Sequence, residues 1–327
     1  MINILLFAEP TQQRESIVIK TGGKWNPNDR HVIWLAGSIG TLEKGNIPKT
    51  HDWFLIAVNE LNNQKDIDAV EKLIDEGAKV LLDSGIFWLT NEHKRKHGIT
   101  MDEALALAPD EIDNFDKLWD RYLAVNKRLG NKVWGYMELD QGGAKNKRIT
   151  RKKLHDLGIN PIPVWHPLND GAEYFDELAE NYDRMCLGNI VQANTATRLR
   201  LLHTLWEKHR KYPDLWVHVL GMNPSEVFNA IGIDSADAST WIAPVRWGSF
   251  PHQAMNDAYL EHMEPEWRSM YSADERVEVG VNDDGKILQA AAISMSHAQI
   301  GWRDFYKRRA DLIGDVIYPP IDEKESV

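Results

Sequence analysis

The stretch AKVLLDSGIFWL, residues 78–89, places a short apolar run directly before a carboxylate and a glycine. Val80, Leu81 and Leu82 are typical of a strand that is buried on both faces, as in a parallel sheet. Asp83 ends that run, and a buried charge is costly unless a partner pairs with it. Gly85 allows the backbone to turn sharply or to lie close to a ligand. The stretch therefore predicts a buried strand that ends either in a turn capped by Asp83 or at a functional site.

The same pattern, a short apolar run followed by a longer amphipathic segment, recurs along the chain. The other apolar runs are residues 31–37, 53–59, 133–140, 161–167, 184–190, 216–222 and 231–237. The helix-like segments are residues 64–77, 109–130, 171–182, 194–211 and 223–231. Strands that alternate with helices predict a parallel sheet, and about eight strands over roughly 230 residues fit an α/β fold of the (β/α)₈ TIM-barrel type. A doubly wound open sheet is the alternative, but no G-x-G-x-x-G motif follows the first strand.

The alternation stops after residue 250. Residues 276–293, RVEVGVNDDGKILQAAAI, predict a hairpin with an Asp-Asp-Gly turn, and a helix is expected to follow at 296–312. We therefore expect a catalytic barrel domain over residues 1–250 and a C-terminal appendage over residues 251–327, packed on the barrel.

Composition limits the class of protein. The 327 residues carry a net charge of −11 and a single cysteine, Cys186. A net negative charge argues against a protein whose whole surface binds phosphates, but it is compatible with one local basic segment. A single cysteine excludes an internal disulfide and a multi-cysteine zinc site, and it suits a reducing compartment. No apolar run approaches the ~20 residues of a membrane span, so we expect a cytoplasmic protein without a membrane partner.

Polar residues end several of the predicted strands. Asp83, Asp140 and Asp237 end three of them, with Glu138 beside Asp140 and Asp234 beside Asp237, and His166 and His218 are expected at two other strand ends. In a parallel barrel the strand ends form the active site, so three carboxylates there indicate function more than turn capping. Two carboxylates that flank a reacting carbon suit chemistry at an anomeric centre, and a third can bind a base edge. Three carboxylates can equally hold a divalent metal, which leaves a metal-dependent hydrolase as an alternative.

Four segments resemble, in order, the motifs of the tRNA-guanine transglycosylases. LLDSGIF, residues 81–87, is similar to the Asp-Ser-Gly-Gly-Phe signature of that family, and YMELDQGG, residues 136–143, to its base-recognition strand. MCLGNI, residues 185–190, stands where the family has a Gly-Gly-Leu. HVLGMNPSEVFNAIGIDSADAST, residues 218–240, resembles the family's segment that ends in Gly-Ile-Asp-x-x-Asp. The resemblance covers residues 78–245 and implies a glycosyltransferase of the pentosyltransferase type.

The sequence departs from the family in two respects, which change the metal and the substrate that we expect. The family's zinc site needs three cysteines and a histidine in the C-terminal part, whereas this chain has only Cys186, so we expect no metal and no cofactor. The basic C-terminal region that grips tRNA is missing or replaced. The spacing from Asp237 to Trp241 and the compact size look more like the DNA-directed branch. That branch is the DpdA group of phages and bacterial islands, whose members place 7-deazaguanines in DNA as an anti-restriction modification.

The resemblance implies a role for individual residues. Asp237 matches the nucleophile that attacks C1′ and forms a covalent glycosyl intermediate, Asp83 matches the general acid/base, and Asp140 matches the residue that binds the base edge. The other residues that it places at the base pocket are Ser84, Gly85, Gly188, Asn189, Met222 and Asp234. Asp234 is also the rival nucleophile, because it is expected at the same strand end as Asp237.

A basic segment, AKNKRITRKK at residues 144–153, follows the Asp140 strand. We expect it to be a loop on the same face that holds backbone phosphates. The predicted contacts are Lys145, Lys147, Arg148, Arg151, Lys152 and Lys153; a solvated surface is the alternative. The expected partners are DNA, with tRNA as the alternative, and a free 7-deazaguanine base, and the family resemblance allows a homodimer. If a phage encodes the protein, it acts in the host cytoplasm. A catalytically inactive nucleic-acid-binding barrel is the remaining alternative.

Overall fold

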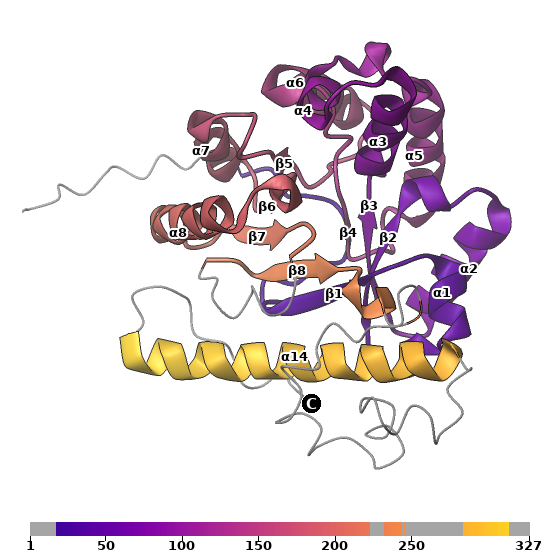
Figure 1. Ribbon diagram of the computed structural model, residues 1–327, viewed down its shortest axis with the longest axis vertical. Coiled ribbons are helices and arrows are strands. Elements are labelled where there is room, and N and C mark those ends of the chain that lie inside the picture. The colour runs from indigo at the N-terminus through magenta and orange to yellow at the C-terminus, as the bar shows by residue number, and fades with distance from the viewer. Residues whose placement is uncertain (1–17, 223–231, 244, 246–283, 314–327) are drawn as a thin grey trace, which may run out of the picture.

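Eight parallel strands form the centre of the computed structural model, which describes residues 18–222, 232–243, 245 and 284–313 (Figure 1). The strands are β1 Val32–Ala36, β2 Trp53–Ala57, β3 Lys79–Asp83, β4 Gly135–Tyr136, β5 Val164–Trp165, β6 Arg184–Leu187, β7 Trp216–Val219 and β8 Ser235–Ala238. Each lies within one of the predicted apolar runs, except that β8 extends one residue beyond its run. Their order in the sheet is β4-β3-β2-β1-β8-β7-β6-β5.

The two ends of this order meet each other. A parallel bridge joins Met137, just after β4, to Ile162, just before β5. The backbone N–H of Glu138 donates to the Ile162 carbonyl at 3.0 Å, and the Ile162 N–H donates to the Tyr136 carbonyl at 2.8 Å. The sheet therefore closes on itself with its strands in chain order, and the predicted (β/α)₈ TIM-barrel fold is confirmed.

Tryptophan side chains fill the inside of the barrel. Trp34 lies at the centre of this group, with its ring centroid 5.1 Å from that of Trp53 and 4.9 Å from that of Trp134. Trp134 continues the cluster to Trp216 at 4.8 Å. All four are buried, as is Cys186 in the same cluster. Burial raises the pKa of the Cys186 thiol well above its usual value, so the single cysteine is a packing residue.

Helices surround the barrel on the outside. The α-helices in the described residues are α1 Ile39–Lys44, α2 Gln64–Asp75, α3 Ile86–His97, α4 Met101–Ala106, α5 Phe115–Leu129, α6 Gly143–Asp156, α7 Ala172–Asn181, α8 Thr195–Lys211 and α14 Asp284–Ile313. The 3₁₀ turns are η1 Ile47–Lys49, η2 Val58–Glu60, η3 Pro109–Glu111, η4 Ile190–Gln192 and η5 Thr240–Ile242. None of these helices has both the length and the apolar character that a membrane crossing requires.

Four of the five predicted helical segments contain helices at the expected places. Residues 64–77, 171–182 and 194–211 correspond to α2, α7 and α8, whereas 109–130 is divided into η3 and α5. The division occurs before Asn114, which adopts a left-handed φ of 62°. The fifth predicted helix, residues 223–231, lies outside the described residues.

The predicted C-terminal hairpin is wrong for its second arm. Residues 284–293 belong to α14, a helix of 30 residues, while residues 276–283 lie outside the described part. Apolar residues in this segment recur at helical spacing, and the buried ones are Ile287, Leu288, Ala291, Ala292, Met295, Ala298 and Trp302. This spacing, with several alanines, favours a helix over the turn signal of Asp-Asp-Gly.

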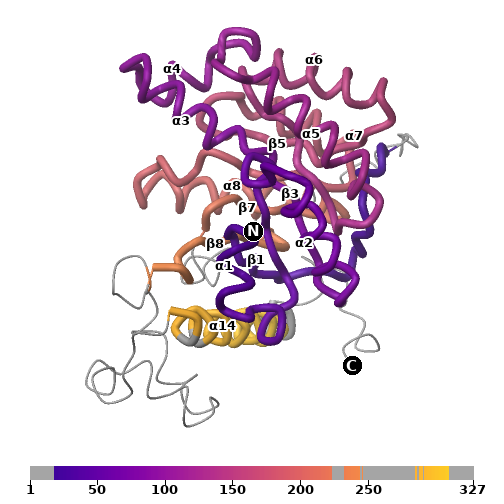
Figure 2. The backbone as a smooth tube through the Cα atoms, turned by 90° about the vertical axis from the view of Figure 1, so that its right-hand side faces the viewer, coloured from indigo at the N-terminus to yellow at the C-terminus, as the bar shows by residue number. Residues whose placement is uncertain are grey.

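Helix α14 packs against β1 and α1 on the outside of the barrel (Figures 1 and 2). The side-chain oxygen of Gln299 accepts a hydrogen bond from the backbone N–H of Ile33 at 2.8 Å. The Ser296 hydroxyl donates to the carbonyl of Thr50 at 2.7 Å and lies 2.8 Å from His51 Nδ1. These bonds tie α14 to β1 and to the segment between η1 and β2.

Candidate active site

Three carboxylates lie in one pocket at the carboxyl ends of the strands. Asp83 is the last residue of β3, Asp140 follows β4, and Asp237 is the third residue of β8. All three line a cavity of about 420 Å³, together with His166 and Gly221; we call it the mouth pocket. The structure thus brings together, from three separate strands, the three residues that the sequence placed at one mouth.

The chain turns sharply directly after Asp83. Gly85 has a left-handed φ of 82° and precedes α3. A Cβ atom at this position would lie 2.6 Å from Asn59 Oδ1, so only glycine fits without strain. The Gly85 backbone N–H also donates to Asp83 Oδ2 at 3.3 Å. Asp83 therefore caps this turn and faces the mouth pocket at the same time, which unites the two interpretations of the sequence.

The protonation of Asp83 is set by its surroundings. Burial raises the pKa of this carboxyl to about 7, and the charges of Asp140 and Asp237 act in the same direction. Hydrogen bonds from the backbone amides of Gly85 and Ser84 oppose the rise. Near neutral pH the group therefore exists in both forms, as a general acid/base requires.

The pKa of Asp140 shifts in the opposite direction to that of Asp83. Its Oδ2 is 2.7 Å from His166 Nε2, and its Oδ1 accepts a hydrogen bond from the Ser84 hydroxyl at 3.2 Å. Burial alone favours the neutral acid, but the hydrogen bond and charge of His166 outweigh it and lower the pKa of Asp140 below its ordinary value. Asp140 is thus a fixed, ionised hydrogen-bond acceptor.

His166 is a site residue to which the sequence analysis gave no role. It follows β5 and lines the mouth pocket, and its backbone N–H donates to Asp170 Oδ2 at 2.7 Å. A Cβ atom on Gly188 would lie 2.8 Å from His166 Nε2, so this glycine makes room for the imidazole. The position of His166 at a strand end was the available signal.

Asp237 is held through one of its two oxygens. The backbone N–H of Gly221 donates to Oδ1 at 2.8 Å, and His218 Nε2 lies 3.3 Å from the same atom. His218 is itself fixed, because its Nδ1 lies 2.6 Å from the Ser235 hydroxyl. Within the described part of the chain both contacts involve Oδ1, so Oδ2 is the oxygen that these residues leave available to a substrate.

Three further predicted pocket residues line the mouth pocket, and two do not. Ser84, Gly188 and Asn189 are among its walls, and the Asn189 side chain donates to Asn169 Oδ1 at 2.7 Å. Met222 is buried in the hydrophobic core and is not among the residues that line the pocket. Gly85 shapes the turn after Asp83 and is likewise not a lining residue.

The prediction that Asp234 lies at the same strand end as Asp237 is wrong. Asp234 precedes β8, at the amino end of that strand, and the rise over three residue steps of strand places the two backbone positions about 10 Å apart. It is fully buried, with Oδ1 2.8 Å from Arg30 Nη1 and Oδ2 accepting from the Val217 backbone N–H at 2.7 Å. Asp234 is therefore a structural ion-pair residue at the opposite end of the barrel.

The basic segment 144–153 is also different from the prediction, because it belongs to helix α6 and is not a loop. Lys147 is fully buried with its Nζ 2.7 Å from Asp170 Oδ2. Arg151 is 4% exposed and lies 3.1 Å from the buried carboxylate of Glu138. Neither residue is available to phosphates, so both assignments are wrong.

The exposed face of α6 carries the other four cations. Arg148 pairs with Glu177, and Lys152 pairs with Asp156 at 2.8 Å. Lys145 and Lys153 are exposed, and their contact with phosphate stays a prediction. The buried positions 147, 150, 151 and 154 follow the period of a helix, and this was the signal that separates α6 from a loop.

Metal binding at the mouth finds little support in this geometry. Within the described residues, His93, His97 and Asp113 are the group of possible ligands whose donor atoms all lie within 4.8 Å of one another. They are on α3 and before α5, outside the mouth pocket. The three mouth carboxylates do not form such a group.

Comparison with known proteins gives no family for this chain. No family model and no curated protein matches it. Among solved structures, the YdjI aldolase from Escherichia coli K12 is similar with a TM-score of 0.38 and 9% identity, over 86% of this chain and 91% of that chain. A designed, cube-shaped protein cage is similar with a TM-score of 0.42 and 12% identity, over 92% of this chain and 78% of that chain. Likenesses this weak carry no information about activity.

Proposed function

We propose that the protein is an enzyme that exchanges guanine in DNA for a 7-deazaguanine base through a covalent aspartyl-glycosyl intermediate. The observation that carries the proposal is the division of labour among the mouth carboxylates. Asp83 has a pKa near 7, Asp140 is held ionised by His166, and the described contacts of Asp237, with Gly221 and His218, are both made by Oδ1. Base exchange needs one proton carrier, one acceptor for the base edge and one nucleophile.

The first half of the reaction removes guanine. Asp237 attacks C1′ of the deoxyribose, and the bond from C1′ to the base nitrogen breaks as the ester forms. Asp83, in its protonated form, gives its proton to the departing base. Its pKa of about 7 means that a large fraction of the enzyme carries this proton at neutral pH.

The second half inserts the new base. The incoming 7-deazaguanine loses its N9 proton to the Asp83 carboxylate, and N9 attacks C1′ from the face that guanine left. The ester bond breaks, which returns Asp237 as a free carboxylate. Two inversions at C1′ retain the configuration, as in a retaining glycosidase. The cycle balances without a cofactor, because Asp83 regains the proton that it gave away.

Asp140 recognises both bases in this proposal. Guanine presents N1–H and an exocyclic amino group on one edge, and a carboxylate accepts hydrogen bonds from both. Replacing N7 by carbon leaves this edge unchanged, so the same residue binds the leaving and the incoming base. The bond from His166 fixes the orientation of the carboxylate.

Nucleic acid is the substrate that suits the surroundings of the mouth pocket. The pocket is concave, with a volume of about 420 Å³, so a target base must leave the stack to enter it. Phe87 lines the pocket and is 51% exposed, and its neighbour Trp88 is 52% exposed. Exposed aromatic rings beside a site provide stacking surfaces for bases.

The test is a base-exchange assay. The full-length protein is incubated with an oligodeoxynucleotide that carries radiolabelled guanine, and a 7-deazaguanine base is added. Release of labelled guanine that depends on the added base supports the proposal, and Asp237→Asn should abolish it. A parallel incubation with labelled tRNA tests the alternative substrate. Release from tRNA alone would move the substrate to RNA, and no release from either would contradict the proposed chemistry.

A further inference from the structure

We propose that His93, His97 and Asp113 form a binding site for a divalent transition-metal cation of the zinc class. The site is separate from the mouth pocket and independent of the proposed base exchange. His93 and His97 are one turn apart on α3, with ring centroids 4.2 Å apart, and Asp113 comes from the segment between η3 and α5. Two histidines at this spacing present their rings on one face of a helix.

The distances among the three donor atoms suit one ion. Asp113 Oδ2 lies 2.8 Å from His97 Nε2 and 3.5 Å from His93 Nδ1. A tetrahedral zinc ion with bonds of about 2.0–2.1 Å separates its ligand atoms by about 3.3 Å. The two distances to Asp113 Oδ2 lie on both sides of that value, and all three donor atoms lie within 4.8 Å of one another, so small side-chain movements are enough to seat the ion.

His93 is already oriented toward the segment that supplies the carboxylate. Its Nδ1 accepts a hydrogen bond from the backbone N–H of Asp113 at 3.1 Å, so the lone pair of this atom points at that segment, and a bound ion would replace this hydrogen bond. His93 is buried, which fixes the ring. The side chains of His97 and Asp113 are 43% and 34% exposed. Three protein ligands with an open side leave one coordination position for water or another ligand.

Lys96 competes with a cation at this site. Its Nζ lies 2.7 Å from Asp113 Oδ2, and its side chain is 67% exposed. The ammonium group neutralises the carboxylate and can move into solvent when a metal ion takes its place. Because both cations use the same oxygen, the lysine weakens metal binding, and its removal should strengthen it.

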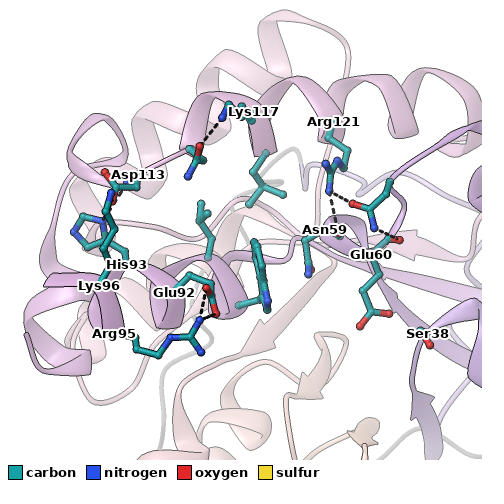
Figure 3. A pocket seen from close by; sticks show the side chains of 15 residues that line it. Ser38, Asn59, Glu60, Glu92, His93, Arg95, Lys96, Asp113, Lys117 and Arg121 are labelled. Atoms are coloured by element: carbon teal, nitrogen blue, oxygen red, sulfur yellow. Dashed lines mark hydrogen bonds and ion pairs between the residues drawn. The ribbon is translucent and has the colours of Figure 1, made fainter. Parts of the chain in front are cut away.

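The site lies at one end of a larger cavity. A pocket of about 930 Å³, the side pocket, is lined by His93, Lys96 and Asp113 at one end and by Ser38 and Glu60 at the other (Figure 3). Ser38 and Glu60 also line the mouth pocket. A bound ion would join α3, whose first turn follows Asp83, to the start of α5.

The experiment is a calorimetric titration of the full-length, chelator-treated protein with Zn²⁺ at neutral pH. The wild type should bind one Zn²⁺ that His97→Ala and Asp113→Asn each lose or bind at least tenfold more weakly. Both residues are partly exposed, and circular dichroism checks that the variants stay folded. His203→Ala is the matched control, because His203 is an exposed histidine on α8, 3.8 Å from a carboxylate one turn away.

A second variant and a second metal sharpen the result. Lys96→Met should bind Zn²⁺ more tightly than the wild type. Co²⁺ should give the visible absorption of a low-symmetry site in the wild type and in His203→Ala, but not in His97→Ala. The proposal is overturned if the wild type binds no Zn²⁺, if His97→Ala and Asp113→Asn bind like the wild type, or if Lys96→Met binds more weakly.

Discussion

Replacing Asp83 by asparagine should change how the stability of the protein depends on pH. The carboxyl has a pKa of about 7 in the folded protein because it is buried near Asp140 and Asp237, whereas an unfolded chain gives it a pKa of about 3.9. The folded state therefore binds a proton more tightly than the unfolded state. Stability that comes from this proton is fully present below pH 4 and is lost as the pH rises through 7.

The size of the effect follows from the two pKa values. Between pH 5 and pH 8 the wild type should lose about 2.5 kcal/mol of unfolding free energy through this one group. Asp83 is only partly enclosed and faces the pocket, so water there screens the charge and makes this an upper value. An asparagine side chain cannot ionise, so the Asp83→Asn protein should escape this loss and gain stability relative to the wild type at high pH.

Urea unfolding at pH 5, 6, 7 and 8, followed by circular dichroism, measures the difference. Asp75→Asn, at an exposed position at the end of α2, is the control and should follow the wild type at every pH. If the stability of Asp83→Asn falls in parallel with that of the wild type from pH 5 to pH 8, then Asp83 does not have the environment described, and its role as the proton carrier loses its basis.

Three other variants test separate parts of the structure. His166→Ala removes a hydrogen bond to the charged Asp140, a loss of about 1.5–3 kcal/mol, so the KM for the free base in the exchange assay should rise about ten- to a hundredfold; an unchanged KM would contradict the role of Asp140. Arg151→Met leaves Glu138 buried without its partner and should cost about 3–5 kcal/mol in urea unfolding, whereas wild-type stability would mean that the pair is not buried. Lys145→Ala should reduce the slope of log affinity for DNA against log salt by about one. An unchanged slope in a filter-binding titration would mean that this lysine does not contact phosphate.

The barrel was predictable because its strands are buried on both faces. Such strands leave unbroken apolar runs at regular intervals, as in residues 78–83, and every strand lies within one of the predicted runs, except that β8 extends one residue beyond its run. The mouth carboxylates followed from the same pattern, since the carboxyl ends of parallel strands share one edge. The turn signal before residue 287 failed because apolar side chains at helical spacing decided the conformation there.

The errors at the site come from partners that a sequence does not display. Lys147 and Arg151 were interpreted as a basic surface because nothing in the sequence shows that Asp170 and Glu138 face them in the folded chain. Asp234 was misplaced because β8 has only four residues and begins directly after it. The apolar run 231–237 does not reveal at which residue the strand begins, so both carboxylates were assigned to its carboxyl end.

Covalent trapping at Asp237 tests the central claim most directly. Wild-type protein is mixed with a substrate oligodeoxynucleotide and a 7-deazaguanine base, and a denaturing gel detects protein bound to DNA. The account predicts an adduct with the wild type, with the Asp75→Asn control and with Asp234→Asn, whose carboxylate lies at the far end of β8. It predicts none with Asp237→Asn, because an amide does not attack C1′. An adduct that persists in Asp237→Asn, or that disappears in Asp234→Asn while that variant remains folded, would contradict the assignment of Asp237 as the nucleophile.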